Sequence, residues 1–542
     1  MARKLVLLTT ILLLSASLAF AGGQEEEGGG GAQAAEPEEM EQVYYEGWLS
    51  GCGSDATLNT TCTHRLDYYV NHPLAAITWK GTVQPLLAED WEMQEDGKVF
   101  IFNLREDVKW HDGEDFTAED VVFSYNAYAN PKVGSRWSIK ASTIMGYEAF
   151  QNGDANSLEG VSAIDEDTVR VELSREMPLW PKLEQTYLVV FPEHLLGDAA
   201  PEQLIQDPYW RNRVGTGPFK WEEYKADQYI SLVPNEDYFM GAPELDRIVL
   251  RFYSDASTHV AALEAGEVHT TAYETTLISV NDVERLDSKE DIDVVIMEKG
   301  SPTFLRMNHD REWGDVRVRK AIRYGIDIES ILEAIYPGAR PAITMFPQDW
   351  AVPDEGLIQY EYDPERAREL LDEAGWSGRD VDFVYHYGDQ LNQSLIVALQ
   401  QNLAEIGINI KPRKMDPAGL HSLQNSDEFD MGYFASGMGL DPATGENVVA
   451  SGSVLSQGYS NTDIDELFQE GKSLSDRDER QPIYHEISEI LNDELPSIWL
   501  WYDIRPLGFN TNVKGPKSHW EEQGIIYFNM PVYNEIHNWR VE

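Results

Sequence analysis

The sequence predicts an α/β protein that folds into two or more lobes. About 500 residues follow the first forty positions of the 542-residue chain, whereas single hydrophobic cores stop growing at about 250–300 residues. Short β-branched and aromatic runs alternate with capped, amphipathic segments along this length, and this alternation indicates strand-and-helix units. We therefore expect a mixed fold with more than one core.

The clearest of these units lies in residues 87–126. The run Val99–Leu104, VFIFNL, predicts a strand, and Gly97 supplies a turn before it. Thr117 predicts a helix N-cap, with Asp120 as its capping-box partner. Apolar residues then recur at helical spacing, at Ala118, Val121, Val122, Tyr125 and Ala129. The stretch therefore predicts a strand, a turn and a capped helix.

The first 21 residues predict a secretory signal peptide. A basic pair precedes an apolar run, residues 5–14, and the motif AFA, which ends at Ala21, fits a cleavage site. No cysteine lies at the end of this run, and the first one in the chain is Cys52, so we expect cleavage without a lipid anchor. Residues 22–42 are rich in Gly and Glu and predict a disordered linker. The mature protein is therefore expected in the periplasm.

The charge of the chain excludes one class of partner. Lys and Arg number 42 against 94 Asp and Glu, which gives a formal net charge of −52. With no basic stripe to offset it, this charge argues against nucleic acid. A saline habitat would screen the resulting self-repulsion, and simple surface drift is the alternative. Both explanations stay open.

Cys52 and Cys62 are the only cysteines in the chain. In an oxidising compartment two cysteines this close can form a local disulfide, and two free thiols are the alternative. A metal site would need more ligands than this pair and His64 offer. We expect neither a metal nor another cofactor.

Several phrases of the sequence stand together in an order that identifies a family. LAEDW, DGKVFIFNLR, VKWHDG and FTAEDVVFSYN follow one another in residues 87–126. Further phrases are VGTGPF from Val214, NEDYF from Asn235, TFLRMN from Thr303, DVRVRKAI from Asp315 and YDPERARELLDEAGW from Tyr362. Together they resemble the bacterial extracellular solute-binding proteins of family 5, the oligopeptide- and dipeptide-binding type that serves ABC importers.

The resemblance implies a periplasmic-binding-protein-like fold of type II. Two α/β lobes would be joined by two crossing hinge strands, with an extra subdomain in the first lobe. We expect lobe I at residues 43–302, its subdomain at about 73–214, lobe II at 303–502, and a return to lobe I at 503–542. The crossing strands would then contain Thr303–Asn308 and Ser497–Asp503.

The same resemblance implies a transport function. The protein would capture a ligand by hinge closure, as a monomer, and deliver it to the transmembrane permease of an ABC importer. A peptide is the preferred ligand, with an oligosaccharide as the alternative. Nickel carriers share the fold, but no histidine cluster points to nickel.

Aromatic residues supply most of the candidate ligand contacts. Strand alternation would place Trp499 and Trp501 on one face, where the two indoles could stack on a sugar; packing within the protein is the alternative. Trp48 is a candidate wall of the ligand site, and a core position is equally consistent with the sequence. The predicted contacts are Trp48, Phe304, Asp441, Trp499, Trp501 and Tyr502.

Asp441 is the candidate polar anchor. It precedes Pro442 in a loop after a predicted strand, Phe429–Ala435, and ligands of open α/β sheets bind at strand ends. The resemblance implies an aspartate near this point that pairs with the α-amino group of a peptide. A turn-initiating Asp-Pro is the alternative. No position for a cation that would take the ligand carboxylate is evident.

Enzyme motifs are missing from the sequence. Gly471-Lys472-Ser473 ends like a phosphate-binding loop, but Glu466 stands where its first glycine belongs. The chain has no H-E-x-x-H, G-x-S-x-G or C-x-x-C. We therefore expect a binding protein, with a secreted hydrolase as the alternative from another class.

Overall fold

The computed structural model describes most of the chain from residue 41 onward. The described residues are 41–49, 58–59, 66–77, 83–94, 98–174, 188–271, 278–386, 390–416, 419, 423, 428–435, 441–453, 455–474, 476–515, 525–526 and 535–542. They belong to one compact unit, Glu41–Glu542. The predicted signal peptide, Cys52 and Cys62 lie outside the described residues.

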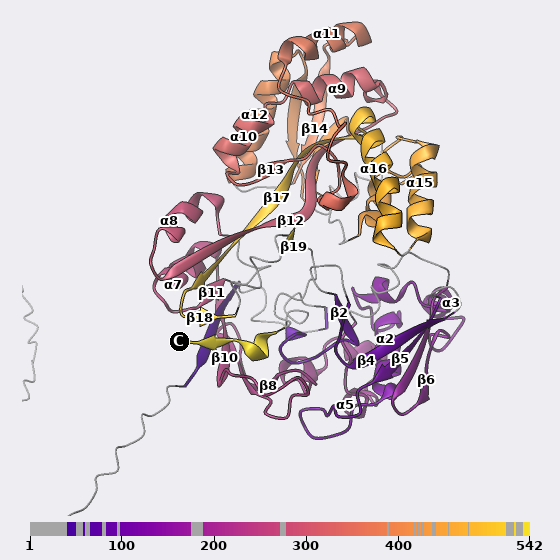
Figure 1. Ribbon diagram of the computed structural model, residues 1–542, viewed down its shortest axis with the longest axis vertical. Helices are drawn as coiled ribbons and strands as arrows, with labels where there is room; N and C mark the ends of the chain where they lie inside the picture. The colour runs from indigo at the N-terminus through magenta and orange to yellow at the C-terminus, as the bar shows by residue number, and fades with distance from the viewer. Residues whose placement is uncertain are drawn as a thin grey trace, which may run out of the picture. The chain divides into compact units, whose positions relative to one another are not determined.

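Among these residues, twelve strands form one large sheet (Figure 1). Its first section has two antiparallel strands and three parallel ones, in the order β8–β9–β10–β1–β11. These are β8 (Phe219–Lys225), β9 (Tyr229–Pro234), β10 (Arg247–Tyr253), β1 (Val43–Leu49) and β11 (Thr270–Thr271). Helices α7 (Ala256–Glu264) and α8 (Val283–Asp287) belong to this section.

The second section of the sheet contains three mutually parallel strands in the order β15–β14–β16. These are β14 (Asp380–Tyr385), β15 (Asn409–Lys414) and β16 (Met431–Ala435). The helices around it are α9 (Val316–Tyr324), α10 (Ile328–Ile335), α11 (Pro364–Ala374), α12 (Gln390–Glu405), α14 (Glu446–Val449), α15 (Thr462–Ser473) and α16 (Arg477–Glu494). Parallel neighbouring strands must be joined by a crossover connection, which is usually a helix, and strands and helices alternate along this part of the chain.

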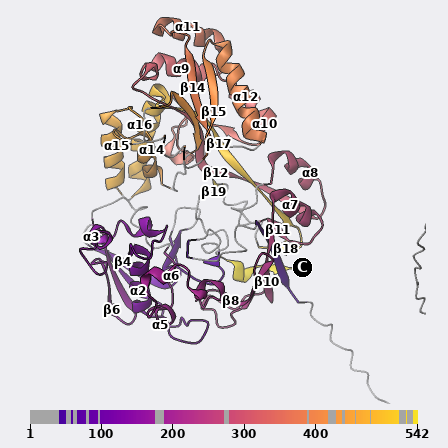
Figure 2. The ribbon, with the colours of Figure 1, turned by 180° about the vertical axis from the view of Figure 1, so that it is seen from behind.

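Two long antiparallel strands join the two sections. β12 (Ile292–Met307) and β17 (Ser497–Asn510) lie side by side along most of their length, as Figures 1 and 2 both show. β12 pairs with β16 in the second section, and β17 pairs with β11 in the first. Two short strands, β13 (Arg340–Pro341) and β19 (Ile525–Ile526), pair with β17 and β12 between the sections. We call this region the crossing.

A separate antiparallel sheet contains the strand predicted at Val99–Leu104. Its order is β4–β5–β7–β6, with β4 (Ala88–Gln94), β5 (Val99–Leu104), β6 (Val161–Asp165) and β7 (Thr168–Glu172). Helix α2 (Ala118–Ala129) begins after Thr117, whose N–H donates to Asp120 Oδ2 at 2.9 Å, as the capping box predicts. Short helices complete this part, α3 (Tyr147–Asn152), α5 (Glu193–Leu196) and α6 (Pro201–Leu204).

Two small strand pairs and several 3₁₀ turns complete the described structure. The pairs are β2 (Ala75–Ile77) with β3 (Val83–Pro85), and β18 (Val513–Lys514) with β20 (Arg540–Val541). In the described ranges, none of the helices is both long and apolar enough to cross a bilayer.

The buried hydrophobic residues that are described gather into four clusters. One of them surrounds the second sheet section and contains Phe304, Trp499 and Trp501. Another belongs to the four-stranded sheet and its helices, and two belong to the first section. More than one core is present, as the length of the chain predicts.

Candidate functional site at the crossing

The pairing of the strands fixes the direction in which each parallel strand runs. In the first section β11 is antiparallel to β17, with Thr270 opposite Phe509, so β11 runs toward the crossing. β1 and β10 are parallel to β11 and therefore run the same way. In the second section β16 is antiparallel to β12 and ends at Ala435, opposite Thr303. β14 and β15 are parallel to β16, so the parallel strands of both sections end toward the crossing.

This convergence locates the candidate site. Ligands of open α/β sheets bind outside the carboxyl ends of the parallel strands, and here those ends approach the crossing from both sides. Tyr253, Tyr385, Lys414 and Ala435 are the last residues of β10, β14, β15 and β16. Much of the chain that follows β1, β11, β14 and β16 lies outside the described residues. The described part of the site is therefore the crossing and the residues packed on it.

Trp48 lies on β1, opposite Phe252 of β10, and its side chain is fully buried in a core cluster of the first section. The core position that the sequence left open therefore accounts for Trp48 in this structure. Its role as a wall of the ligand site stays a prediction.

Trp499 and Trp501 do not share a face of the sheet, contrary to the alternation expected from sequence. Trp499 pairs with Phe304, whereas Trp501 pairs with the adjacent Thr303, so Leu500 is an extra residue in β17. Such a β-bulge reverses the alternation of side chains beyond it. The ring contacts agree: Trp499 packs edge-on against Phe304, with centroids 5.4 Å apart.

Trp501 packs on the other face. Its ring contacts Tyr433, with centroids 6.4 Å apart, and Tyr433 pairs with Leu305. The second ring against it is Tyr336, at 5.5 Å. Phe304, Trp499, Trp501 and Tyr502 are each 1 % exposed. In this conformation packing inside the protein accounts for these aromatic residues, and their contact with a ligand stays a prediction.

Tyr502 lies at the crossing and is held by two carbonyl groups. Its hydroxyl is 2.8 Å from Thr344 O and 2.7 Å from Phe346 O, and burial raises the pKa of this phenol. The guanidinium of Arg340 stacks on the Tyr502 ring, 4.0 Å from its centroid. Arg340 in turn donates two hydrogen bonds to Glu298 of β12.

The Glu298–Arg340 pair was missed by sequence analysis. Burial raises the pKa of Glu298, and the hydrogen bonds and charge of Arg340 only partly oppose that effect. The two residues are 42 positions apart, and no motif connects them. Only the pairing of β13 with β17 brings Arg340 to the crossing.

Asp441 already has a cationic partner in the structure. Arg480 of α16 donates from Nη1 to Asp441 Oδ2 at 2.7 Å and from Nη2 to Oδ1 at 2.5 Å. Burial would lower the pKa of Arg480, but the hydrogen bonds and charge of Asp441 outweigh it and raise that pKa. Asp441 Oδ1 also accepts from the Ala443 N–H at 2.8 Å and caps the 3₁₀ turn Pro442–Gly445.

The turn-initiating role of Asp441, which the sequence left open, is therefore present. Asp441 is 8 % exposed and both of its oxygens accept bonds from Arg480. A ligand amine would have to compete with that guanidinium. The amine-anchoring role of Asp441 stays a prediction.

The phrases that identify the family meet at a structural junction. His111, from VKWHDG, accepts the Gly215 N–H at Nδ1 (3.1 Å), and its Nε2–H donates to Gly217 O (2.9 Å). Asn235, from NEDYF, donates to the same carbonyl at 3.1 Å. A Cβ on Gly215 would lie 1.7 Å from Val70 O.

The glycines of VGTGPF are thus needed for close approach between two backbone segments. Neither Gly215 nor Gly217 has a positive φ, so a left-handed backbone conformation is not the reason for them. These phrases build a joint between the four-stranded sheet and the first section, away from the candidate site.

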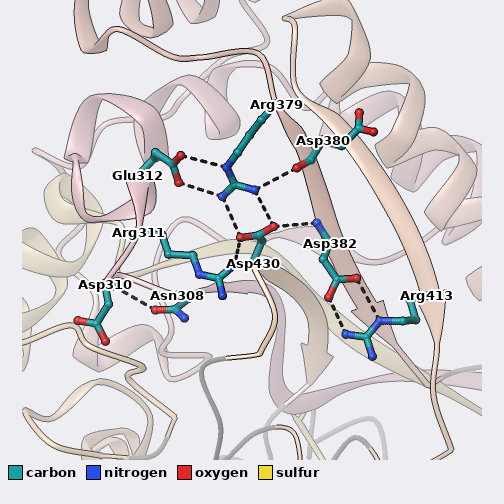
Figure 3. Close-up of polar contacts among 9 residues, drawn as sticks. All are labelled: Asn308, Asp310, Arg311, Glu312, Arg379, Asp380, Asp382, Arg413 and Asp430. Atoms are coloured by element: carbon teal, nitrogen blue, oxygen red, sulfur yellow. Dashed lines mark hydrogen bonds and ion pairs between the residues drawn. The ribbon is translucent and has the colours of Figure 1, made fainter.

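A polar network lies at the end of the second section that faces away from the crossing; Figure 3 shows its residues. Asp430, just before β16, accepts hydrogen bonds from Arg379, Arg311 and the Asp382 N–H. Arg379 also donates two bonds to Glu312, and the paired carboxylates raise the pKa of Arg379. Because β14 and β16 begin here, this network is at the amino ends of parallel strands. The network therefore connects the first residues of neighbouring strands, far from the crossing.

No group of three or more His, Cys, Asp or Glu side chains in the described part of the chain is arranged to hold a metal ion. The candidate disulfide of Cys52 and Cys62 falls outside that part. It stays a prediction.

Two α/β lobes joined by a pair of crossing strands define a binding-protein architecture. The sequence profile described as "Bacterial extracellular solute-binding proteins, family 5 Middle" matches residues 82–453. The chain belongs to this family. The first and second sheet sections are its lobes I and II, and the four-stranded sheet is the extra subdomain of lobe I. The residue boundaries predicted for these parts stay predictions.

Two relatives illustrate the match. A Brucella ovis protein, provisionally named an ABC transporter peptide-binding protein, is 32 % identical over 371 residues, covering 66 % of each chain; the match thus spans just under two thirds of that relative. Oligopeptide-binding protein AppA of Bacillus subtilis is 25 % identical over 463 residues, covering 81 % of this chain and 82 % of AppA.

Solved structures share the fold. That of Bacillus subtilis AppA in complex with a nonapeptide has a TM-score of 0.70 at 22 % identity and covers 93 % of this chain and 99 % of AppA. AppA of Clostridium difficile, provisionally named a peptide-binding protein, has a TM-score of 0.78 at 23 % identity and covers 92 % of this chain and all of that one.

Proposed function

We propose that this protein captures a peptide between its two lobes and delivers it to the permease of an ABC importer. The observation that carries the proposal is the convergence of the parallel strands of both lobes on the crossing. A ligand held there touches both lobes, so closing about β12 and β17 removes it from water. Hinge closure of this kind is the usual way in which two-lobed binding proteins hold ligands.

Peptide is favoured over oligosaccharide for two reasons. The relatives described above are named for peptides, and one was solved with a nonapeptide. Sugar stacking was predicted to use Trp499 and Trp501 together, whereas these indoles lie on opposite faces and are each 1 % exposed. A peptide can instead be held mainly through its backbone, with pockets for its side chains.

The first test is native mass spectrometry of the purified mature protein, before and after mild denaturation releases its cargo. A set of peptide masses supports the proposal. A ladder of hexose or pentose masses refutes the peptide assignment and supports the oligosaccharide alternative. The released ligands should keep their masses when they are incubated with fresh protein, since a hydrolase would cleave them into smaller products.

An Asp441→Asn variant separates the two roles of this residue. If Asp441 binds the ligand amine, the variant loses retained peptide even in its folded fraction. If it serves only the turn and Arg480, the melting temperature falls while retention per folded molecule is kept. Asp380→Asn is the matched control, because Asp380 is exposed and pairs with Lys411 at 3.4 Å, at the far end of lobe II.

The remaining parts of the proposal concern the cellular setting. We propose an exported, periplasmic protein that begins at Gly22 after cleavage and acts as a monomer without catalysis. N-terminal sequencing of protein from an osmotic-shock fraction tests the first statement, and a full-length chain confined to the cytoplasm would contradict it. Light scattering of the purified protein tests the second.

A further inference from the structure

The ladder between β12 and β17 is interrupted at the crossing. One regular stretch pairs Ile292–Glu298 with Ile504–Asn510, and a second begins where Pro302 pairs with Tyr502. Between them three residues of β12 stand opposite the single residue Asp503 of β17. Extra residues of this kind bend a strand and disrupt its ladder. The two stretches are therefore free to change their mutual angle more easily here than elsewhere.

An ion pair bridges this interruption. Glu298 is the last residue of the first stretch, and Arg340 of β13 pairs with Tyr502, which begins the second. Arg340 Nε donates to Glu298 Oε2 at 2.6 Å, and Nη2 donates to Oε1 at 3.0 Å. A fork of two parallel hydrogen bonds fixes the relative orientation of its partners as well as their separation.

The arginine is held in place from the lobe II side. Its guanidinium lies 4.0 Å from the centre of the Tyr502 ring, and Nη2 donates to Pro347 O at 3.1 Å. The Glu298 side chain is 15 % exposed and that of Arg340 is 44 % exposed. Asp349 approaches Arg340 at 3.8 Å but is 97 % exposed, so water screens that contact.

We propose that the Glu298–Arg340 pair is a restraint across the hinge that sets the angle between the lobes. This inference rests on the hinge closure in the proposed function and identifies residues that govern it. Both are positioning residues: they act on the ligand through the lobes. On the lobe I side, β19 pairs with β12 at Glu298 and Lys299. This pairing holds the strand that carries the Glu298 carboxylate in place.

The test measures the distance between the lobes in protein freed of ligand. Spin labels are attached through ketone-bearing residues at Glu290 in lobe I and Glu365 in lobe II, two exposed positions, which leaves the cysteines untouched. Pulsed electron paramagnetic resonance then gives the distance distribution for wild type, Glu298→Gln, Arg340→Met and the double variant. The matched control is the Lys320–Asp493 pair of 2.6 Å, which lies within lobe II, changed to Met and Asn.

The three hinge variants should share one altered distribution, and the double variant should add nothing to either single one. The ratio of the populated conformations should change about two- to fivefold, the factor that a partly exposed ion pair supplies. The control pair should leave the distribution unchanged. Distributions identical to wild type in the hinge variants, or effects that simply add, would overturn the inference.

The same proteins distinguish this inference from the proposed function. Peptides released from the wild-type protein are resynthesised and returned to each variant, and their dissociation rates should change in the hinge variants only. If no peptide is bound but the distributions change as expected, the peptide assignment fails and the hinge restraint stands. If peptide binds and closes the two lobes to the same extent in wild type and in the hinge variants, the inference about the restraint fails and the proposed function stands.

Discussion

Replacing Asp430 by Asn should destabilise lobe II without touching the candidate site. The Asp430 residue is 4 % exposed and its carboxylate accepts from Arg379 Nη1 at 2.7 Å, Arg379 Nη2 at 2.8 Å and the Asp382 N–H at 2.9 Å (Figure 3). Arg311 supplies a further bond. Asn has nearly the same shape, but it lacks the charge, and its NH₂ group must face a donor.

The expected loss follows from the exposure of the partners. Breaking a buried ion pair by removing one partner costs about 3–5 kcal/mol. Here the side chains of Arg379 and Arg311 are 31 % and 37 % exposed, so water recovers part of that energy. Arg379 also keeps its two bonds to Glu312. We expect a loss of about 2–4 kcal/mol, or about 4–16 °C in the melting temperature of a unit of about 200 residues.

Calorimetry over a range of pH provides the assay. Burial alone would raise the pKa of Asp430, but the hydrogen bonds from Arg379, Asp382 and Arg311 outweigh it and lower the pKa. A carboxylate with a lowered folded pKa stabilises the protein above its unfolded pKa of about 3.9, and the effect is lost as pH falls through the folded value. The difference between wild type and variant should therefore be full at about pH 6 and shrink below about pH 4.

The control for this prediction is Asp380→Asn. Asp380 is the first residue of the neighbouring strand β14, but its side chain is 63 % exposed, and exposed ion pairs contribute about 0–1 kcal/mol. Equal losses in the two variants, or an Asp430→Asn protein that melts like wild type, would refute the reasoning about buried partners.

Three further predictions concern the whole chain. Gly215→Ala should cost about 1–3 kcal/mol, since its Cβ would lie 1.7 Å from Val70 O; an unchanged melting temperature would contradict that contact. Burial lowers the pKa of His111 to about 4, and its bond from the Gly215 N–H requires a neutral ring. Because the unfolded chain then binds more protons, stability should fall as pH drops from about 6.5 to about 4, with a flatter profile in His111→Gln. With a net charge of −52, raising NaCl from about 0.1 to 1 M should raise the melting temperature as the Debye length shortens; no rise would favour surface drift.

The local elements were predictable because their causes are local. Asp315 caps α9 by accepting from the Arg317 N–H, and Asp363 caps α11 by accepting from the Arg366 N–H; aspartate is one of the residue types that favour this position. Gly375 ends α11 in the left-handed conformation. Caps and turns are decided by groups a few residues apart, so single-sequence reasoning reaches them. The family, and with it the two-lobed fold, was recognisable from phrases of the same length.

The return strand shows the limit of that reasoning. SIWLWYD predicts a strand with both indoles on one face, yet β17 continues to Asn510 and bulges at Leu500. A bulge depends on how the strand meets its partner, here β12, about 200 residues earlier in the chain. The residues of β17 alone do not indicate the bulge.

The sequence by itself determined the strands, the helix caps and the family of this protein, since each depends on neighbouring residues or on short ordered phrases; export stays a prediction. Only the tertiary structure decided what the candidate site residues touch. Asp441 meets Arg480 because a loop and α16 come together, and Glu298 meets Arg340 because β13 joins β17 at the interrupted ladder. Burial and partner choice are properties of contacts between distant segments, and a charge or a ring acquires its role only when those contacts exist.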